Sequence, residues 1–379
     1  MKVFFTLDSL ANAGTEKSTL DILSHFSKDI EVKVIHFFPG FDLKDDYEKA
    51  GIPLHYVGLS GKREFIKGTR SLIRLIKTEK PHLIVSSIMR ANFYSRFAGI
   101  ITGTPIIGTF VNDSYGALRI EEMKRKKQYM SYRIFWLMDK YTSWIPKYWI
   151  SNAISIAQSN IKALGISKGK TKVIYRGREI ALFPPYQPSV DRSVFKFVFV
   201  GRLLERKGLG ELLDAVKIVK EKYPHIKLDI CGHGLFRKKV ESFIIKLQLQ
   251  DTVSLHGKVP NGWKRLYESD CFVFPSWYEG FSGALVEAMA VGIPIIASDI
   301  PMNMEAINDK TALIYPVKDT NKLVARMVRV IEEYPKMIEM GKRAREEAAA
   351  RFDIRQIAAQ YESFLIEVAN GKVEKETLI

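Results

Sequence analysis

Short apolar runs alternate along the chain with longer stretches in which apolar residues recur every three or four positions. The runs at residues 2–7, 32–37, 82–85 and 105–108 are typical of buried β-strands. Between the first two runs, residues 15–26 have the spacing of an amphipathic helix. Strands that alternate with helices in this way predict parallel sheets covered by helices, which places the chain in the α/β class.

Three prolines fall within the seven residues 183–189, and a new strand pattern begins near Phe195. Proline clusters of this kind are typical of segments between domains. With 379 residues, the chain is also longer than one hydrophobic core usually supports. We therefore predict an N-terminal domain over 1–183, a linker over 184–191 and a C-terminal domain over 192–354, both domains being Rossmann-like.

The most informative stretch of the second half contains a strand, a turn, a helix and another strand in close succession. An apolar run at 271–275 leads into a turn that holds Glu279 and Gly280. A helical pattern then continues to Gly292, and a further apolar run follows at 294–297. This order is that of a βαβ unit in a parallel sheet.

The beginning of that helix has the chemistry of a phosphate site. The backbone N–H groups of Phe281, Ser282 and Gly283 would lie at the positive end of the helix dipole, so they could hold a pyrophosphate. Glu279 would lie in the turn beside the phosphates, and Glu287, two turns into the helix, could accept hydrogen bonds from ribose hydroxyls. The alternative for the two acids is a charge at a helix N-terminus and a solvated helix position.

The same stretch resembles the retaining glycosyltransferases of the GT-B fold, family 4, also known as glycosyl transferases group 1. Their signature is a Glu, seven intervening residues and a second Glu, which Glu279 and Glu287 reproduce. Further matches over most of the chain are 197–203, Lys207 with Gly208, 229–234, and 288–290 with Gly292 and Pro294. The resemblance implies two Rossmann-like domains whose parallel sheets face an interdomain cleft, and a C-terminal helix, about 355–379, that packs back on the N-terminal domain.

The resemblance also assigns roles to several charged residues. Arg202 and Lys207, in register with Gly201, match the family's basic pair that contacts the diphosphate, while Glu279 would contact the transferred sugar and Glu287 the ribose. A leaving diphosphate gains negative charge as the anomeric bond breaks, so cations and helix dipoles would stabilise it without a metal ion. A surface ion pair is the alternative for either cation. The anomeric configuration would be retained, with no catalytic base nominated.

Other parts of the donor site are expected from weaker matches. Gly14 lies in a segment that resembles the family's glycine loop, although Ala13 stands where most members have another glycine. His233 follows a predicted strand, and Lys258 with Val259 matches the segment whose backbone receives the nucleobase. Ordinary turn and loop roles are the alternatives for Gly14 and His233.

Two departures from the family pattern concern the N-terminal half and its end. Many relatives place a His after the strand at 105–109, whereas this chain has Asn112 and Asp113. We expect these two residues on the acceptor side of the site, with capping of the next segment as the alternative. Where relatives usually have Asn-Gly, this chain has Arg176 before Gly177, so Arg176 could face the phosphates or the acceptor, or lie on the surface.

Basic residues are concentrated in one part of the chain. Residues 51–190 carry 23 Lys and Arg against 7 Asp and Glu, and the remaining residues are balanced. Basic runs lie at 62–77 and at 124–127, the latter followed by Tyr129, Tyr132, Phe135, Trp136, Tyr141, Trp144, Tyr148 and Trp149. Cations beside amphipathic rings suit an anionic membrane surface and a lipid-borne acceptor. A solvated face with core aromatics is the alternative, and nucleic acid is disfavoured because no nucleic-acid module accompanies the charge.

Several classes of protein are disfavoured by what the sequence lacks. No Asp-x-Asp motif or zinc-type Cys and His spacing is evident, so we expect no cofactor and no metal. Cys231 and Cys271 both fall in predicted buried strands of a protein in a reducing compartment. Without a secretory signal or an apolar run long enough to span a bilayer, we expect a cytoplasmic protein, peripheral on the inner face of the membrane. A Rossmann oxidoreductase is disfavoured because no G-x-G-x-x-G follows the first strand.

These patterns together predict a hexosyltransferase-like enzyme. It would move a sugar from a nucleotide-sugar donor to a glycolipid or glycan acceptor in the synthesis of a bacterial surface polysaccharide or lipopolysaccharide. The alternative is a GT-B protein that has lost catalysis and serves as a scaffold or binding protein at the membrane. The intact set of Arg202, Lys207, Glu279 and Glu287 favours the enzyme.

Overall fold

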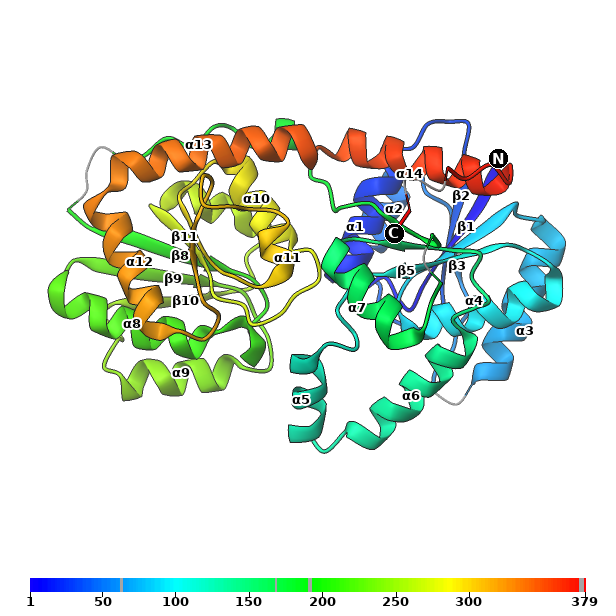
Figure 1. Ribbon diagram of the computed structural model, residues 1–379, viewed down its shortest axis with the longest axis horizontal. Helices are drawn as coiled ribbons and strands as arrows, with labels where there is room; N and C mark the ends of the chain where they lie inside the picture. The colour runs from blue at the N-terminus through cyan, green and yellow to red at the C-terminus, as the bar shows by residue number, and fades with distance from the viewer. Residues whose placement is uncertain (62–63, 168, 190–192, 375–377) are drawn as a thin grey trace. The chain divides into compact units, whose positions relative to one another are not determined.

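The computed structural model describes residues 1–61, 64–167, 169–189, 193–374 and 378–379. Each of its two sheets is parallel throughout, and the packing divides the chain into two compact units (Figure 1). The N-terminal unit contains Met1–Gly177 together with Ile354–Ile379, and the C-terminal unit contains Arg178–Asp353. The predicted α/β class with two Rossmann-like units is therefore confirmed.

The N-terminal unit is built on a seven-stranded sheet in the order β3-β2-β1-β4-β5-β6-β7. Its strands are β1 (Lys2–Leu7), β2 (Glu31–His36), β3 (Leu54–Tyr56), β4 (Leu83–Ser86), β5 (Ile106–Phe110), β6 (Tyr148–Ser151) and β7 (Thr171–Val173). Its helices are α1 (Gly14–Leu23), α2 (Lys44–Lys49), α3 (Phe65–Glu79), α4 (Met89–Thr102), α5 (Ala117–Arg125), α6 (Tyr129–Thr142), α7 (Ile154–Leu164) and α14 (Ile354–Ala369).

Both faces of this sheet are buried because successive side chains of each strand point to opposite sides. In β1, Val3 and Phe5 enter one core, whereas Phe4 enters another core together with residues of α3 and α4. The C-terminal segment belongs to the first of these cores, in which Phe364 and Leu365 of α14 are buried. Figure 1 shows α14 beside α1, so the end of the chain completes the N-terminal unit.

The C-terminal unit has a six-stranded sheet in the order β10-β9-β8-β11-β12-β13. Its strands are β8 (Phe195–Val200), β9 (Ile226–Cys231), β10 (Val253–Gly257), β11 (Cys271–Phe274), β12 (Ile295–Ser298) and β13 (Leu313–Tyr315). Its α-helices are α8 (Leu209–Lys222), α9 (Arg237–Lys246), α10 (Gly283–Val291), α11 (Pro301–Met304), α12 (Thr320–Glu332) and α13 (Tyr334–Arg351). Its 3₁₀ turns are η1 (Ile180–Leu182), η2 (Glu205–Lys207) and η3 (Gly262–Glu268).

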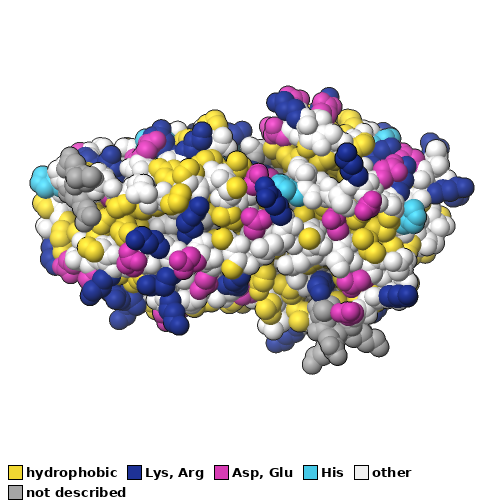
Figure 2. All heavy atoms as spheres, turned by 90° about the horizontal axis from the view of Figure 1, so that it is seen from above, with side chains coloured by type: hydrophobic (Ala, Val, Ile, Leu, Met, Phe, Trp, Pro, Cys, Tyr) yellow, Lys and Arg dark blue, Asp and Glu magenta, His cyan; other side chains and the backbone are white. Residues whose placement is uncertain are grey.

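The exposed side of α13 carries ion pairs between neighbouring turns. Lys342 lies 2.7 Å from Glu339, and Lys336 lies 3.3 Å from Glu333. Figure 2 shows one face of the molecule on which Lys and Arg side chains are interspersed with Asp and Glu. Such mixed charge is typical of a solvated surface.

The structure places the boundary between the units earlier than the proline cluster predicted. It falls between Gly177 and Arg178, and most of the expected linker packs on the C-terminal unit. Tyr186 is buried there: its backbone N–H donates to the carbonyl of Val291 at 2.9 Å and its hydroxyl donates to the carbonyl of Ser269 at 2.7 Å. The prolines prevent regular structure, but buried aromatic side chains fix the segment. Residues 190–192, which are the end of the expected linker and the first residue of the expected C-terminal domain, lie outside the described residues.

Asp8 joins the end of β1 to the beginning of α4. Its carboxylate accepts a hydrogen bond from the backbone N–H of Ala91 at 2.9 Å. Burial raises the pKa of the Asp8 carboxyl to about 6, although the N–H of Ala91 and the charge of Arg90 act in the opposite direction. Between pH 4 and pH 6 the folded chain therefore binds more protons at Asp8 than the unfolded chain does, so this residue makes the protein less stable as the pH rises.

We expect Asp8→Asn to remove this pH dependence, because an amide cannot ionise but still offers an oxygen to Ala91. The free energy of unfolding of the variant should rise relative to that of the wild type by about 2 kcal/mol between pH 4 and pH 7. Denaturant titrations across that range measure the difference. A difference that stays constant with pH would contradict the assignment.

Candidate functional site

The predicted donor-binding residues of the C-terminal unit gather at one edge of its sheet. In parallel α/β sheets, ligands bind beyond the carboxyl ends of the strands. The residues that follow these ends are Gly201 and Arg202 after β8, His233 after β9, Lys258 and Val259 after β10, and Glu279 after β11. Because neighbouring strands are parallel, the sheet brings these residues to the same edge.

The loops after β8 and β9 are tightly packed against each other. A Cβ atom at Gly232 would collide with the carbonyl oxygen of Gly201, so no larger residue fits there. The N–H of Leu203 donates to the carbonyl of His233 at 2.8 Å, which fixes the second loop against the first. The side chains of Arg202 and His233 are exposed, and so is that of Lys258 after the next strand. These groups are therefore held on a rigid backbone with their side chains in solvent.

The centre of this edge is an ion pair between Lys207 and Glu279. Lys207 closes the turn η2, and its ammonium group contacts the Glu279 carboxylate. Both residues are only 7% exposed, and the Lys207 ammonium also lies 5.2 Å from the centre of the Phe274 ring. Gly208, which follows Lys207, has a φ of +67°, and a Cβ atom there would collide with the Pro275 carbonyl. This glycine allows η2 to approach the strand end closely enough for the pair to form.

The electrostatics of the pair favour the charged form of Glu279. Burial alone would raise the pKa of its carboxyl, but the positive charges of Lys207 and Arg206 outweigh burial and lower it. Burial lowers the pKa of the Lys207 ammonium, and the Glu279 charge opposes that change. The site therefore holds an ionised carboxylate and an ammonium group side by side in a largely buried position.

The predicted phosphate-binding segment begins α10. Ser282 is the residue immediately before the helix and Gly283 is its first residue. The Phe281 side chain is 1% exposed and packs against Phe352, with 5.2 Å between the ring centres. Phe281 is thus a core residue, and only its backbone could serve a ligand.

Arg178 is a member of this site that sequence reasoning missed. Its Nε atom donates to Oε1 of Glu287 at 2.8 Å, and both side chains are mostly buried. The guanidinium also lies against Gly283, since a Cβ atom there would collide with it. A cation at a helix N-terminus is disfavoured by the helix dipole unless an anion is nearby, and Glu287 supplies that charge. No spacing rule links position 178 to positions 283 and 287, so the sequence could not predict this contact.

In the N-terminal unit, Gly14 begins α1 as predicted and lies beside Arg176. A Cβ atom at Gly14 would be 3.0 Å from an Arg176 guanidinium nitrogen. A small hollow of about 30 Å³ adjoins this point and is lined in part by Arg176, Thr15, Ser18 and Asn152. The glycine loop and the arginine that replaces the usual Asn thus meet at the carboxyl edge of the N-terminal sheet.

Asn112 and Asp113 follow β5 at that edge and have local partners. Oδ1 of Asp113 accepts a hydrogen bond from the Ser159 hydroxyl at 2.6 Å. The other carboxylate oxygen lies so close to Gly116 that a Cβ atom there would collide with it. The carbonyl of Asn112 accepts from the side-chain amide of Asn160 at 3.2 Å. These contacts organise the start of α5, and a role toward an acceptor stays a prediction.

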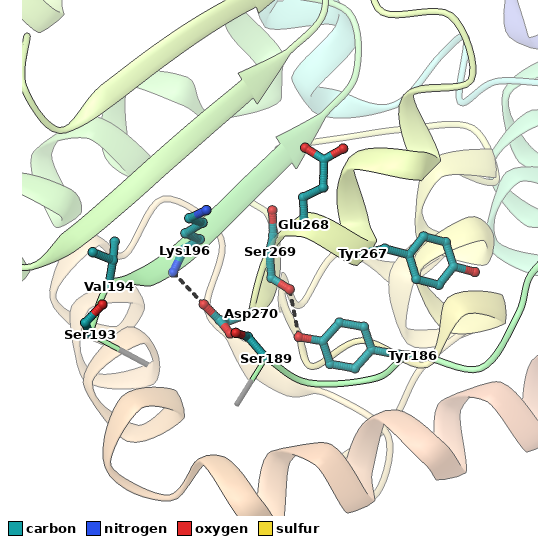
Figure 3. Close-up of a pocket in the computed structure, with 9 residues that line it drawn as sticks. All are labelled: Tyr186, Ser189, Ser193, Val194, Lys196, Tyr267, Glu268, Ser269 and Asp270. Carbon is teal, nitrogen blue, oxygen red and sulfur yellow. Dashed lines mark hydrogen bonds between the residues drawn. The ribbon is translucent and has the colours of Figure 1, made fainter. Parts of the chain in front are cut away.

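A pocket of about 480 Å³ lies elsewhere in the C-terminal unit, at the amino ends of β8 and β11 (Figure 3). Its polar groups bond to one another: the N–H of Lys196 donates to Asp270 at 2.7 Å, and the Tyr186 hydroxyl points toward Ser269. It contains none of the predicted site residues and lies at the opposite end of the strands from Glu279. Because ligands of parallel α/β sheets bind at the carboxyl ends of the strands, this pocket is not a candidate donor site. The bond from Tyr186 to Ser269 beside it anchors the 183–189 segment.

Within the part of the chain that the structure describes, no group of three or more His, Cys, Asp or Glu side chains could hold a metal ion. Cys231 and Cys271 are both buried and unpaired with each other. That no metal is required stays a prediction, and it depends on Arg202, Lys207 and the α10 N-terminus stabilising the diphosphate in place of a metal ion.

Comparison with protein families gives two matches that cover different halves of the chain. Residues 13–182 match the family model described as Glycosyltransferase Family 4. Residues 187–347 match the one described as Glycosyl transferases group 1.

Three curated relatives match over 73–83% of their own length. An uncharacterized glycosyltransferase of Methanocaldococcus jannaschii is 30% identical over 306 residues, which are 76% of this chain and 73% of that protein. The capsular polysaccharide biosynthesis glycosyltransferase CapH of Staphylococcus aureus is 25% identical and covers 80% of this chain and 83% of its own. An Escherichia coli UDP-Gal:alpha-D-GlcNAc-diphosphoundecaprenol alpha-1,3-galactosyltransferase is 26% identical, with 76% of each chain covered.

Among solved structures, HepE of Anabaena in complex with UDP-glucose superposes with a TM-score of 0.81. The two chains are 21% identical, and the match covers 97% of this chain and 100% of the other. At this identity the similarity shows the fold, which is that of two Rossmann-like units.

The Lys207–Glu279 pair should show strong energetic coupling. We expect Lys207→Met and Glu279→Gln each to lower the free energy of unfolding by about 3 kcal/mol, because each leaves a buried charge without its partner. The double variant should lose clearly less than the sum of the two, since neither charge then remains. Chemical denaturation of the four proteins without ligand measures the coupling, and additive losses would show that the two groups are not paired.

Proposed function

Because this chain belongs to the glycosyl transferases group 1, a family with the GT-B fold, we propose that it transfers a sugar from a nucleotide-sugar donor to a lipid-linked or polysaccharide acceptor. The chain is a glycosyltransferase by family, and its relatives include enzymes named for capsular polysaccharide and colanic acid synthesis. The proposal adds that the anomeric configuration of the sugar is retained, that no metal ion takes part, and that the acceptor is met at the membrane.

The observation that carries the proposal is the buried Lys207–Glu279 pair at the carboxyl end of β11. Burying two charges carries a desolvation penalty, and well-packed apolar residues of similar volume often stabilise a fold as well or better. It lies on the two loops, after β8 and after β11, that also present Arg202 and the start of α10. Such a concentration of charge at a strand-end edge is what a polar, anionic ligand requires.

In the proposed reaction the leaving nucleoside diphosphate gains negative charge as its bond to the sugar breaks. Arg202 can bind a diphosphate with two parallel N–H groups, and Lys207 adds a compact charge. The first backbone N–H groups of α10 add the positive end of the helix dipole. Glu279, held ionised by its neighbours, can accept hydrogen bonds from sugar hydroxyls and stabilise positive charge on the anomeric carbon.

In this proposal Glu287 binds the ribose while it also holds Arg178. A carboxylate has two oxygens and can accept several hydrogen bonds, so a ribose hydroxyl and the guanidinium can share it. Arg178 would thereby fix the orientation of the acid. The proposed nucleotide would thus extend from the phosphates at the α10 N-terminus along the first turn of the helix.

The nature of the acceptor is proposed from the relatives and from the charge of the chain. The E. coli relative is named for transfer to a sugar on diphosphoundecaprenol, which is a lipid carrier. No helix in the described residues is long and apolar enough to cross a bilayer. From the lipid carrier named for that relative and the basic excess of residues 51–190, we propose a peripheral association with the membrane in which the acceptor lies.

Transfer measured with a panel of nucleotide sugars, beginning with UDP-sugars, tests the proposal. Lys207→Ala should lower kcat about 100-fold or more, because it removes about 3 kcal/mol of stabilisation of the leaving diphosphate. The matched control is Lys246→Ala, an exposed lysine of α9 in the same unit, which should transfer at the wild-type rate. Circular dichroism verifies that both variants fold. Near-normal turnover in Lys207→Ala would remove the assignment, and wild-type protein that binds donors without transferring or hydrolysing them would favour a scaffold.

Retention makes a separate prediction about the product. With an α-linked donor, the new glycosidic bond should also be α, because the acceptor attacks from the face that the diphosphate leaves. Proton NMR of the purified product distinguishes the two anomers through the coupling constant of the anomeric hydrogen. A β-linked product would show inversion and overturn this part of the proposal while leaving the transferase activity in place.

A further inference from the structure

Helix α6 presents a row of apolar side chains to solvent. Its members, which we call the α6 stripe, are Met130, Ile134, Leu137, Met138 and Tyr141. They recur at intervals of three, four and one residues, which places them on a single face of the helix. Met130 is 73% exposed, Ile134 54% and Tyr141 72%, and no residue of α6 is buried.

The opposite face of the same helix is firmly attached to the N-terminal unit. The Trp136 side chain donates to the carbonyl of Ala163 at 3.1 Å. Asp139 accepts from the Tyr115 hydroxyl at 2.5 Å and forms an ion pair with the fully buried Arg96 at 2.6 Å. These contacts fix the rotation of α6, so the stripe is turned away from the core by construction. Figure 1 shows α6 at the periphery of this unit.

Positive charge lies along one side of the stripe. Arg133 and Lys140 are exposed and seven residues apart, so they lie one above the other on the helix. Their cationic groups are 5.9 Å and 5.2 Å from the centre of the Trp136 ring, which holds both beside the apolar row. The basic run 124–127 precedes α6, and exposed Trp144 follows it. Lys126 of that run is paired with Glu122. Within the described residues, however, no ion pair with an acid is found for Arg133 or Lys140, unlike the exposed cations of α13.

The structure shows which of the aromatic residues that follow the basic run 124–127 are exposed and could contact a membrane. Trp149 is 1% exposed and stacks on Phe110, with 4.2 Å between the rings, so it belongs to the core. Trp136 anchors the helix, whereas Tyr141 and Trp144 face solvent. Of the other basic run, 62–77, the residues Lys62 and Arg63 lie outside the described residues and the remainder lies mostly on α3.

We infer that the α6 stripe, with Arg133 and Lys140 beside it, is a docking surface for an anionic lipid bilayer. An apolar row bordered by cations matches the boundary between acyl chains and acidic headgroups, where amphipathic rings such as Tyr141 and Trp144 also settle. A second copy of the chain fits less well, because a symmetric dimer would bring the same cations of both copies together. The biological setting of this inference rests on the proposed function, but the surface itself does not.

Binding of the full-length protein to vesicles tests the inference. Vesicles of phosphatidylglycerol and phosphatidylethanolamine, without any glycolipid acceptor, are compared in a sedimentation assay with vesicles of phosphatidylcholine. The wild type should bind the anionic vesicles and lose binding in high salt. The double variant Ile134→Ser/Tyr141→Ser should bind at least tenfold more weakly, and Arg133→Gln/Lys140→Gln about 20-fold more weakly.

Matched controls lie on α9 of the C-terminal unit. Ile245→Ser removes an exposed apolar side chain there, and Lys238→Gln/Lys246→Gln removes two exposed cations with the same change in net charge. Both controls should bind vesicles like the wild type. UDP binding, measured by calorimetry, should be unchanged in the α6 variants, so a failure of the donor site and a failure of this surface can be told apart. Thermal melting confirms that all variants are folded.

Three results would overturn the inference. The first is an absence of binding to anionic vesicles by the wild type. The second is binding that the α6 variants retain at full strength. The third is a concentration-dependent dimer, seen by analytical ultracentrifugation, that the Ile134→Ser/Tyr141→Ser variant abolishes, since a second copy would then cover the stripe.

Discussion

The contact between the Lys207 ammonium and the Glu279 carboxylate is the interaction on which the site depends. It ties the loop after β8 to the loop after β11, and it keeps both charges at the edge of the sheet with little solvent around them. Their mutual attraction and the nearby Arg206 keep the carboxylate ionised despite its burial. The pair fixes the polar groups of both loops in position, which limits the reorganisation that donor binding requires.

A second pair of a cation and an acid, Arg178 and Glu287, lies at α10, the helix that follows the Glu279 loop. Arg178 lies on Gly283 at the start of α10 and bonds to Glu287, just over one turn further along the helix. Both pairs combine a cation with an acid from the family signature. Under the proposed function the signature would have two roles: it would supply acceptors for a sugar and a ribose, and it would neutralise the cations that bind the phosphates of the same ligand.

Much of the fold was predictable because its signals are local. Buried parallel strands appear as short apolar runs, and the turn with Gly208 depends on a residue that can adopt positive φ. The pairing of Lys207 with Glu279, 72 positions apart, has no local signal, and neither has the contact of Arg178 with α10. The prolines of 183–189 suggested a linker because proline disrupts regular secondary structure locally. The anchoring of Tyr186 is a tertiary contact, which local sequence does not predict. Sequence also could not say which face of α6 is turned outward.

The most direct test of this account is a crystal structure with a bound nucleoside diphosphate such as UDP. The account predicts that the two phosphates contact Arg202, Lys207 and the first backbone amides of α10, with the ribose within hydrogen-bonding distance of Glu287. A nucleotide bound elsewhere in the C-terminal unit, for example in the pocket beside Tyr186 at the amino ends of the strands, with the Lys207 side chain remote from any phosphate, would contradict it.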